Sequence, residues 1–289
     1  MSRRRILLET TIQMHRLADD LQIRRAINEE LNDADVYCTS FVLRELLRTI
    51  IASLAFVYTC VKKLGADGDG YLALERLVRL LAQGEGQFSP RSARREQYVV
   101  AAILERFGST RIALSELLCY LEYVSRKWLR DFYRVPLASG GRFEIVGEFF
   151  LTGLDEKAAE MSDWIRNSDR IPGPPRFPSG ASRFLDQRQE AVGAVHEAMA
   201  KCEARRRDDR LVLILTRLRT NKGEYDFMRR LKVNTRGNWC LGDLLIALET
   251  PSNVAIYTED RHFEIICGVL PRGIHPGPRI RDIRAKLSQ

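Results

Sequence analysis

Histidine and closely spaced cysteines are scarce in this sequence of 289 residues. Its six cysteines stand far apart with no CxxC or CxH pair, so we expect neither a disulfide framework nor a zinc site. Reduced thiols in a cytosolic protein fit this pattern best. None of the four histidines, His15, His196, His262 and His275, stands in a nucleophile motif, which argues against a serine hydrolase. We interpret His262 as a structural residue of a turn.

Long apolar segments are also missing. After three arginines at positions 3–5, only Ile6, Leu7 and Leu8 precede Glu9, and this run is too short for the core of a signal peptide. The longest apolar run, 49–61, is shorter than the roughly 20 residues that a membrane span needs. We therefore expect no membrane association and a cytoplasmic location.

The chain is basic, with a net charge of +8 and a pI near 9.3, which favours a polyanionic partner. Between Asp169 and Arg236 there are sixteen Lys and Arg against nine Asp and Glu, and Tyr225, Phe227 and Trp239 lie in or near this segment. Cations interleaved with aromatic rings suit RNA, whereas a solvated helix surface is the simpler alternative. The candidate RNA-binding residues are Arg205, Arg206, Arg207, Arg217, Arg219, Lys222, Arg229, Arg230 and Lys232.

Hydrophobic periodicity predicts strands alternating with helices. The expected strands cover residues 5–8, 35–39, 143–151, 254–257 and 268–270. The expected helices cover 12–33, 41–64, 72–81, 93–107, 115–132, 154–165 and 184–207, with a short apolar helix opening at Gly242; residues 211–218 are either helix or strand. Helix capping is expected from Thr10 or Thr11, and from Ser40, Ser109 and Ser115.

This alternation predicts an α/β fold with a central parallel sheet between two layers of helices. We expect a single composite domain over residues 1–289. Its core would comprise about 1–64, 140–166 and 237–272, and two helical insertions would cover about 65–135 and 167–236.

Four acids stand at strand ends or in the helices that follow them: Glu9, Glu45, Asp243 and Asp260. Because the carboxyl ends of parallel strands share one edge of a sheet, these acids should gather there. Each also has a simpler interpretation. Glu9 could contribute to the field of a helix N-terminus, Glu45 could pair with a neighbouring arginine, Asp243 could cap its helix and Asp260 could begin a turn.

The arrangement resembles the PIN-domain family of metal-dependent ribonucleases. The resemblance rests on the segments 8–11 (LETT), 39–45 (TSFVLRE), 242–248 (GDLLIAL) and 258–263 (TEDRHF). It implies a PIN-like three-layer α/β/α fold with an inserted α-helical region. It further implies that Glu9, Glu45, Asp243 and Asp260 are the catalytic, metal-binding acids, with Thr10 and Thr258 as polar groups beside them. The implied cofactor is Mg²⁺ or Mn²⁺, ions that prefer carboxylate oxygens.

The function that the resemblance implies is hydrolysis of RNA phosphodiester bonds by an endoribonuclease. A role as a toxin or defence effector restrained by a protein inhibitor is compatible with it, and a homo-oligomer stays open. The main alternative is a catalytically degenerate PIN-like subunit that binds RNA or protein within a larger complex. A third possibility is a basic helical adaptor in which all four acids are structural. Whether Glu9 converges with the other three acids discriminates between these functional hypotheses.

Overall fold

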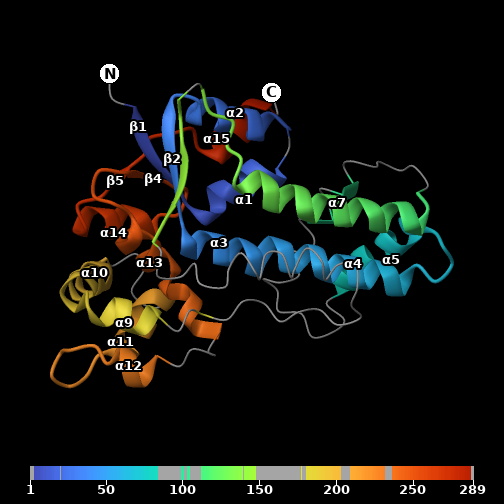
Figure 1. Ribbon diagram of the computed structural model, residues 1–289. Helices are drawn as coiled ribbons and strands as arrows, with labels where there is room; N and C mark the ends of the chain where they lie inside the picture. Colours follow the sequence, from blue (N-terminus) through green and yellow to red (C-terminus); the bar gives the residue numbers. More distant parts are fainter. Residues whose placement is uncertain are drawn as a thin grey trace.

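The computed structural model describes residues 3–19, 21–83, 99–100, 103–104, 112–138, 140–147, 177, 180–202, 209–231 and 236–287. Within these residues the centre of the fold is a five-stranded sheet whose paired strands are all parallel, in the order β3-β2-β1-β4-β5 (Figure 1). The strands are β1 (Arg4–Leu8), β2 (Ala34–Thr39), β3 (Phe143–Val146), β4 (Ala255–Tyr257) and β5 (Gly273–Ile274). The predicted α/β class with a parallel sheet is therefore confirmed.

Strand β1 lies at the middle of the sheet because both of its faces are apolar. Ile6 and Leu8 contact one hydrophobic cluster, and Leu7 contacts the other. From β1 the chain passes to β2 on one side, whereas β4 later pairs with β1 on the other side. The strand order thus reverses between β1 and β4, and in α/β folds such a switch point opens a crevice at the carboxyl ends of the strands.

Helices cover both faces of the sheet. The cluster on one face joins Ile6 and Leu8 to α2 (Leu21–Leu31) and α15 (Ile280–Leu287). On the other face, α13 (Gly242–Glu249) contacts both α3 (Ser40–Leu46) and α14 (His262–Val269). Helix α1 (Thr10–Ala18) follows β1 directly and contacts α2 and α3.

The expected helix over 41–64 continues away from the sheet as one side of a helical arm (Figure 1). It runs through α3, a π-helical segment (Leu47–Ile51) and α4 (Ala52–Leu64). Helix α4 packs against α5 (Gly70–Gln83) and α7 (Leu114–Phe132), which confirms the helices expected at 72–81 and 115–132. The helix expected at 93–107 falls largely outside the described residues.

The helices after residue 180 correct one expectation. The single helix expected at 184–207 is wrong, because α9 (Ala181–Asp186) and α10 (Gln189–Lys201) are separate helices. The break lies at Arg188, whose backbone leaves the helical region at φ −126° and ψ 28° and whose guanidinium lies 3.8 Å from the ring centroid of Phe184. The segment 211–218, left open as helix or strand, is helical in α11 (Arg210–Leu218), and α12 (Phe227–Arg230) follows.

The last strand and two helix caps also differ from expectation. Residues 268–270 belong to the end of α14 rather than to a strand, since Phe263, Ile266 and Cys267 are buried at helical spacing; β5 follows later. Thr39 rather than Ser40 caps α3 through a bond from Val42 N to its hydroxyl, and α7 begins after Ala113 with no side-chain cap from Ser115. Strand β3 is seen over 143–146, while 148–150, the helix expected at 154–165 and Ser109 lie outside the described residues.

No helix among the described residues is both long and apolar enough to cross a membrane.

Glu249, at the end of α13 and outside the candidate site, is a buried acid whose ionisation should make folding stability depend on pH. Burial raises the pKa of Glu249 to about 8, although hydrogen bonds from Thr39 and Ser40 and the charge of Arg188 favour its anion. Because this pKa is higher in the folded than in the unfolded chain, folding stability is lost as the pH rises toward 8, by up to about 1.4 kcal/mol per pH unit. We expect Glu249→Gln to be more stable than the wild type at pH 8 and to lose this advantage near pH 4.5. Urea unfolding at several pH values measures the difference; an advantage that does not change with pH contradicts the prediction.

Candidate metal and nucleotide site

The four predicted acids come from four elements that meet at the carboxyl edge of the sheet. Glu9 follows β1, Glu45 lies in α3, Asp243 lies in the first turn of α13 and Asp260 follows β4. Glu9 is buried, and the negative charges of the other three carboxylates contribute to raising its pKa. The structure therefore gathers all four acids in one cluster at this edge, and among the described residues the ligand atoms that all lie within 4.8 Å of one another belong to Asp243, Asp260 and His262.

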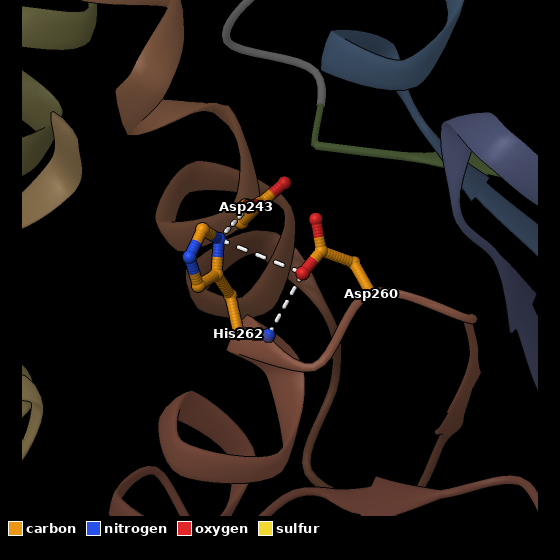
Figure 2. A group of neighbouring side chains, drawn as sticks. All are labelled: Asp243, Asp260 and His262. Carbon is orange, nitrogen blue, oxygen red and sulfur yellow. Dashed lines mark hydrogen bonds and ion pairs between the residues drawn. The ribbon is translucent and has the colours of Figure 1, made fainter. Parts of the chain in front are cut away.

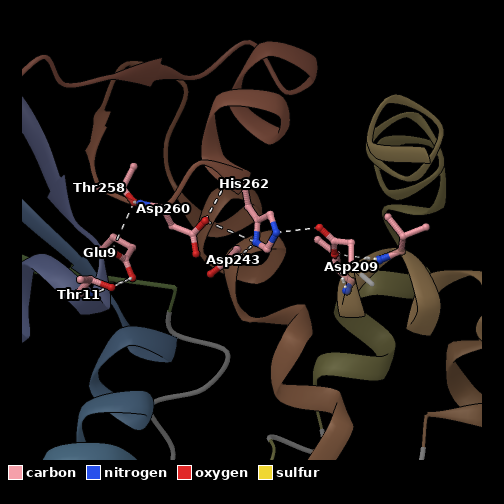
Figure 3. Close-up of polar contacts among 9 residues, drawn as sticks. Glu9, Thr11, Asp209, Asp243, Thr258, Asp260 and His262 are labelled. Carbon is pink, nitrogen blue, oxygen red and sulfur yellow. Dashed lines mark hydrogen bonds and ion pairs between the residues drawn. The ribbon is translucent and has the colours of Figure 1, made fainter. Parts of the chain in front are cut away.

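Glu9 is the most buried member of this cluster, with 4% of its surface exposed. One carboxylate oxygen accepts hydrogen bonds from the amide and hydroxyl of Thr11, at 2.9 and 3.2 Å, so Glu9 itself caps α1 and the expected caps Thr10 and Thr11 are wrong. The other oxygen accepts a bond from the hydroxyl of Thr258 at 3.4 Å (Figure 3). Burial, then the charge of Asp243, raises the pKa of Glu9 well above its ordinary value.

Glu45 is held in the cluster by both neighbouring segments. The hydroxyl of Thr10 donates to Glu45 Oε2 at 2.5 Å, which places Thr10 beside an acid as the sequence predicts. A side chain at Gly242 would come within 2.9 Å of Glu45 Oε1, so the start of α13 lies directly against this carboxylate. Glycine at this position lets Glu45 lie next to Asp243.

This close approach gives a test of packing at the site. In Gly242→Ala the new methyl group would meet Glu45 Oε1 and Phe41 Cε1, both at 2.9 Å, and Phe41 is buried against Phe177 and Trp239. We expect a loss of about 1–3 kcal/mol in unfolding free energy from this overpacking. Denaturant unfolding measures it. The matched control is Gly268→Ala in α14, where nothing lies within 4 Å of the added carbon; it should be neutral or stabilising by up to about 1 kcal/mol. Equal effects of the two changes would refute the packing argument.

Asp243 and Asp260 both lie on the Nδ1 side of the His262 ring (Figure 2). His262 Nδ1 lies 3.0 Å from Asp243 Oδ2 and 3.6 Å from Asp260 Oδ1, and these ligand atoms lie within 4.8 Å of one another. Asp260 also accepts the backbone amide of His262 at 2.8 Å, so it does begin a turn in addition to joining the cluster. Asp243 lies in the first turn of α13 but is not its N-cap, which is Leu241.

The charge of His262 offsets part of the negative charge of the two acids in this trio. The hydrogen bond to Asp243, together with the charges of Asp260 and Asp209, raises the pKa of His262 to about 9. Burial raises the pKa of Asp243, with Asp260 and Asp209 adding to this effect and His262 opposing it. His262 does belong to the turn, through its amide bond to Asp260, and its ring also pairs with the two acids of the cluster.

Asp209 extends the cluster and was not predicted. Its Oδ2 lies 2.8 Å from His262 Nε2, and its Oδ1 accepts the amide of Leu211 at 2.9 Å as the N-cap of α11 (Figure 3). Asp209 follows the basic run 205–207 and precedes the apolar stretch of α11, which is a capping signal in the sequence. Nothing in the sequence indicates that it meets His262, because that contact depends on how α11 packs.

Four of the nine predicted RNA-binding residues lie outside the described residues. They are Arg205, Arg206, Arg207 and Lys232. The other five are exposed on α11, α12 and the turn between them: Arg217, Arg219, Lys222, Arg229 and Arg230. We call these five the α11–α12 basic surface. Arg230 donates to the carbonyls of Arg217 and Arg219, which ties the two ends of this surface together.

The cluster is open to solvent on one side. An open hollow of about 430 Å³ is lined by Thr11, Glu259, Asp260, Arg261 and His262. A neighbouring pocket of about 350 Å³ also includes Asp260 and Arg261 and adds the cations Arg279 and Arg281. A ligand that enters here would therefore meet acids and arginines together.

The donor groups suit a divalent cation. Octahedral coordination with bonds of about 2.1 Å places neighbouring donors about 3 Å apart, close to the spacings found around His262. Several clustered carboxylates also gain most from a cation that neutralises them.

Comparisons with protein-family models, curated proteins and solved structures gave no match to this chain.

Proposed function

We propose that the protein is a PIN-like, Mg²⁺- or Mn²⁺-dependent endoribonuclease whose metal site is the cluster of Glu9, Glu45, Asp243 and Asp260. The observation that carries the proposal is the convergence of these four acids at the switch point of the sheet, with Glu9 buried against the charge of Asp243. Four like charges at one sheet edge oppose folding unless a cation offsets them.

The residues of the chain have distinct roles in this proposal. Asp243 and Asp260 would hold the ion, Glu45 lies beside them against Gly242, and Thr258 donates a hydrogen bond to the carboxylate of Glu9. When bound, a divalent ion lowers the pKa of a water molecule and stabilises the oxygen that leaves the scissile phosphate. Arg261, which lines the hollow beside Asp260, supplies a cation for a phosphate of the substrate.

The α11–α12 basic surface supports a polyanionic substrate. Helix α11 begins next to Asp209, which contacts His262, and it extends about 13 Å to its last residue at about 1.5 Å per residue. An RNA strand leaving the acidic cluster along α11 would reach Arg217 and Arg219 within a few nucleotides. This distance links the cleavage site to a surface that binds phosphates.

Cleavage of mixed structured RNAs by the purified full-length protein tests the proposal, with Mn²⁺, Mg²⁺ or EDTA in parallel. We expect cleavage with a metal and none in EDTA. Absence of cleavage under every metal condition would refute the proposal as it stands. It would favour the degenerate RNA- or protein-binding subunit, an alternative that the deep burial and capping role of Glu9 already make reasonable.

The basic surface gives a separate prediction about binding. Lys222 and Arg229 are exposed cations of this surface, so Lys222→Ala/Arg229→Ala should weaken RNA binding and reduce the slope of log affinity against log salt by about 1.4, at about 0.7 per lost phosphate contact on a single strand. Fluorescence anisotropy in EDTA at several salt concentrations measures both quantities without cleavage.

The matched control for this pair is Lys63→Ala/Arg79→Ala on α4 and α5 of the helical arm, away from α11 and α12 (Figure 1). The control should leave the salt slope unchanged. If both pairs reduce it equally, RNA binding is not localised to the α11–α12 basic surface.

A further inference from the structure

His262 presents one ring nitrogen to two carboxylates at once. Its Nδ1 is 3.0 Å from Asp243 Oδ2 and 3.6 Å from Asp260 Oδ1, with both acids on the same side of the ring (Figure 2). A divalent ion bound by both acids would therefore also be within reach of Nδ1.

The opposite ring nitrogen is held by a fixed carboxylate. His262 Nε2 lies 2.8 Å from Asp209 Oδ2, and the side chain of Asp209 is 3% exposed. Because an ionised carboxylate only accepts hydrogen bonds, Nε2 keeps its hydrogen toward Asp209, and the hydrogen on Nδ1, which faces Asp243 in the metal-free protein, is the one that an ion bound by the two acids would displace. Asp209 cannot turn away easily, since its Oδ1 caps α11 through Leu211 N. Metal-binding histidines commonly donate their second nitrogen to a carboxylate in this way.

The other three histidines have different surroundings. His15 pairs with Asp19, His275 with Glu30, and His196 with the hydroxyls of Tyr225 and Thr216. Within the part of the chain that the structure describes, only His262 forms a group with two acids whose ligand atoms all lie within 4.8 Å. The arrangement is therefore specific to this edge of the sheet.

We propose that His262 is a nitrogen ligand of the bound ion beside Asp243 and Asp260, that Asp209 positions its ring, and that this mixed nitrogen and oxygen site selects Mn²⁺ over Mg²⁺. The inference deepens the proposed function and rests on it for the identity of the site. Imidazole binds transition-metal ions well, whereas Mg²⁺ strongly prefers oxygen donors and retained water. A site of carboxylates alone would have no such preference built into its donors.

Pulsed EPR of Mn²⁺ bound to the full-length protein tests the nitrogen ligand directly. We expect ¹⁴N coupling in the wild type, and its replacement by ¹⁵N coupling when the protein contains ¹⁵N-histidine, so this readout requires no variant. His262→Gln should lose the coupling and bind Mn²⁺ at least about tenfold more weakly, with less than about threefold change for Mg²⁺. The control His15→Gln, at another His–Asp pair, should behave as the wild type. Mn²⁺ bound without nitrogen coupling, or no Mn²⁺ binding, overturns the proposal.

Asp209→Asn tests the positioning role. Asparagine keeps the helix cap, but its amide removes the carboxylate acceptor for Nε2. We expect about a tenfold weaker Mn²⁺ affinity with the ¹⁴N coupling still present, and little change for Mg²⁺. Unchanged Mn²⁺ affinity would show that Asp209 does not position the ring.

The outcomes also separate this inference from the proposed function. Nitrogen coupling in a protein that cleaves no RNA would support His262 as a metal ligand and refute the proposed nuclease activity. The opposite result is metal-dependent cleavage without nitrogen coupling and with equal affinity for Mn²⁺ and Mg²⁺. It would support the nuclease activity and refute His262 as a ligand.

Discussion

Asp243→Asn should reduce metal-dependent RNA cleavage by at least about a thousandfold while making the metal-free protein more stable. The loss is expected because Asp243 lies between His262 and the charge of Glu9, at the centre of the cluster that would hold the ion. Asparagine has nearly the same shape but no charge to bind a cation. Asp260→Asn should lose cleavage in the same way, since its remaining oxygen can still accept the amide of His262 and preserve the turn.

The gain in stability follows from the sign of the pKa shift. Burial and the neighbouring acids raise the pKa of Asp243 in the folded protein, so its ionisation destabilises the fold as the pH rises through that pKa. Removing the charge should therefore raise the unfolding temperature in EDTA at neutral pH. Adding Mn²⁺ should stabilise the wild type by mass action and leave Asp243→Asn unchanged.

The control for these variants is Asp282→Asn on α15, whose side chain is 61% exposed. It should leave cleavage, metal-free stability and the response to Mn²⁺ unaltered. Full cleavage by both Asp243→Asn and Asp260→Asn would exclude the cluster as the metal site.

The sequence was sufficient for the parts of the site that depend on local order along the chain. Glu9 and Asp260 follow buried strands, and Asp243 opens an apolar helix, so their meeting at one edge follows once the sheet is parallel. The placement of Thr258 among the acids is implied by the resemblance to the PIN-domain family, and in the structure it lies next to Glu9 because β1 and β4 are neighbours. The gathering of the acids at one edge needed only strand ends and the period of the apolar residues.

What the sequence did not reveal depends on packing between distant segments. Asp209 reaches His262 because α11 begins beside the start of α14, and no pattern in the sequence fixes that contact. The segment 268–270 was assigned to a strand because three apolar residues have no period of their own, whereas burial shows that they complete α14. Thr10 and Thr11 lie inside α1, which begins at Thr10, so the cap position falls on Glu9, whose carboxylate accepts the amide of Thr11.

The pairing of His262 with Asp209 also changes how the acidic cluster should be understood. Without a bound cation, the raised pKa of His262 keeps a positive charge between Asp243 and Asp260. Glu9 lies farther along the same row, where Thr11 and Thr258 supply hydrogen bonds (Figure 3). The fold thus stabilises Asp243 and Asp260 through the charge of His262, and Glu9 through hydrogen bonds from two threonines.

Glu9→Gln should lower cleavage by about a hundredfold or more and increase the stability of the metal-free protein. The amide oxygen of glutamine can still cap α1 through Thr11, so the local backbone is kept while the negative charge is lost. Because burial and Asp243 raise the pKa of Glu9 in the folded state, ionisation of Glu9 costs stability as the pH rises, and the variant should therefore lose less stability than the wild type. Urea unfolding in EDTA at several pH values, with single-turnover cleavage in Mn²⁺, measures both effects.

Glu9→Asp separates the charge of this residue from its reach. Aspartate keeps the charge and caps helices well, but its carboxylate is withdrawn by about one C–C bond, and Thr258 is already 3.4 Å away in the wild type. A displacement of about 1 Å in a catalytic group can cost on the order of a hundredfold in rate, so we expect Glu9→Asp to be nearly as slow as Glu9→Gln. If Glu9→Gln cleaves as fast as the wild type while Asp243→Asn does not, Glu9 is only a helix cap and the ion is held by the remaining acids. Loss of cleavage in both Glu9 variants with α1 intact would instead place its carboxylate among the metal ligands.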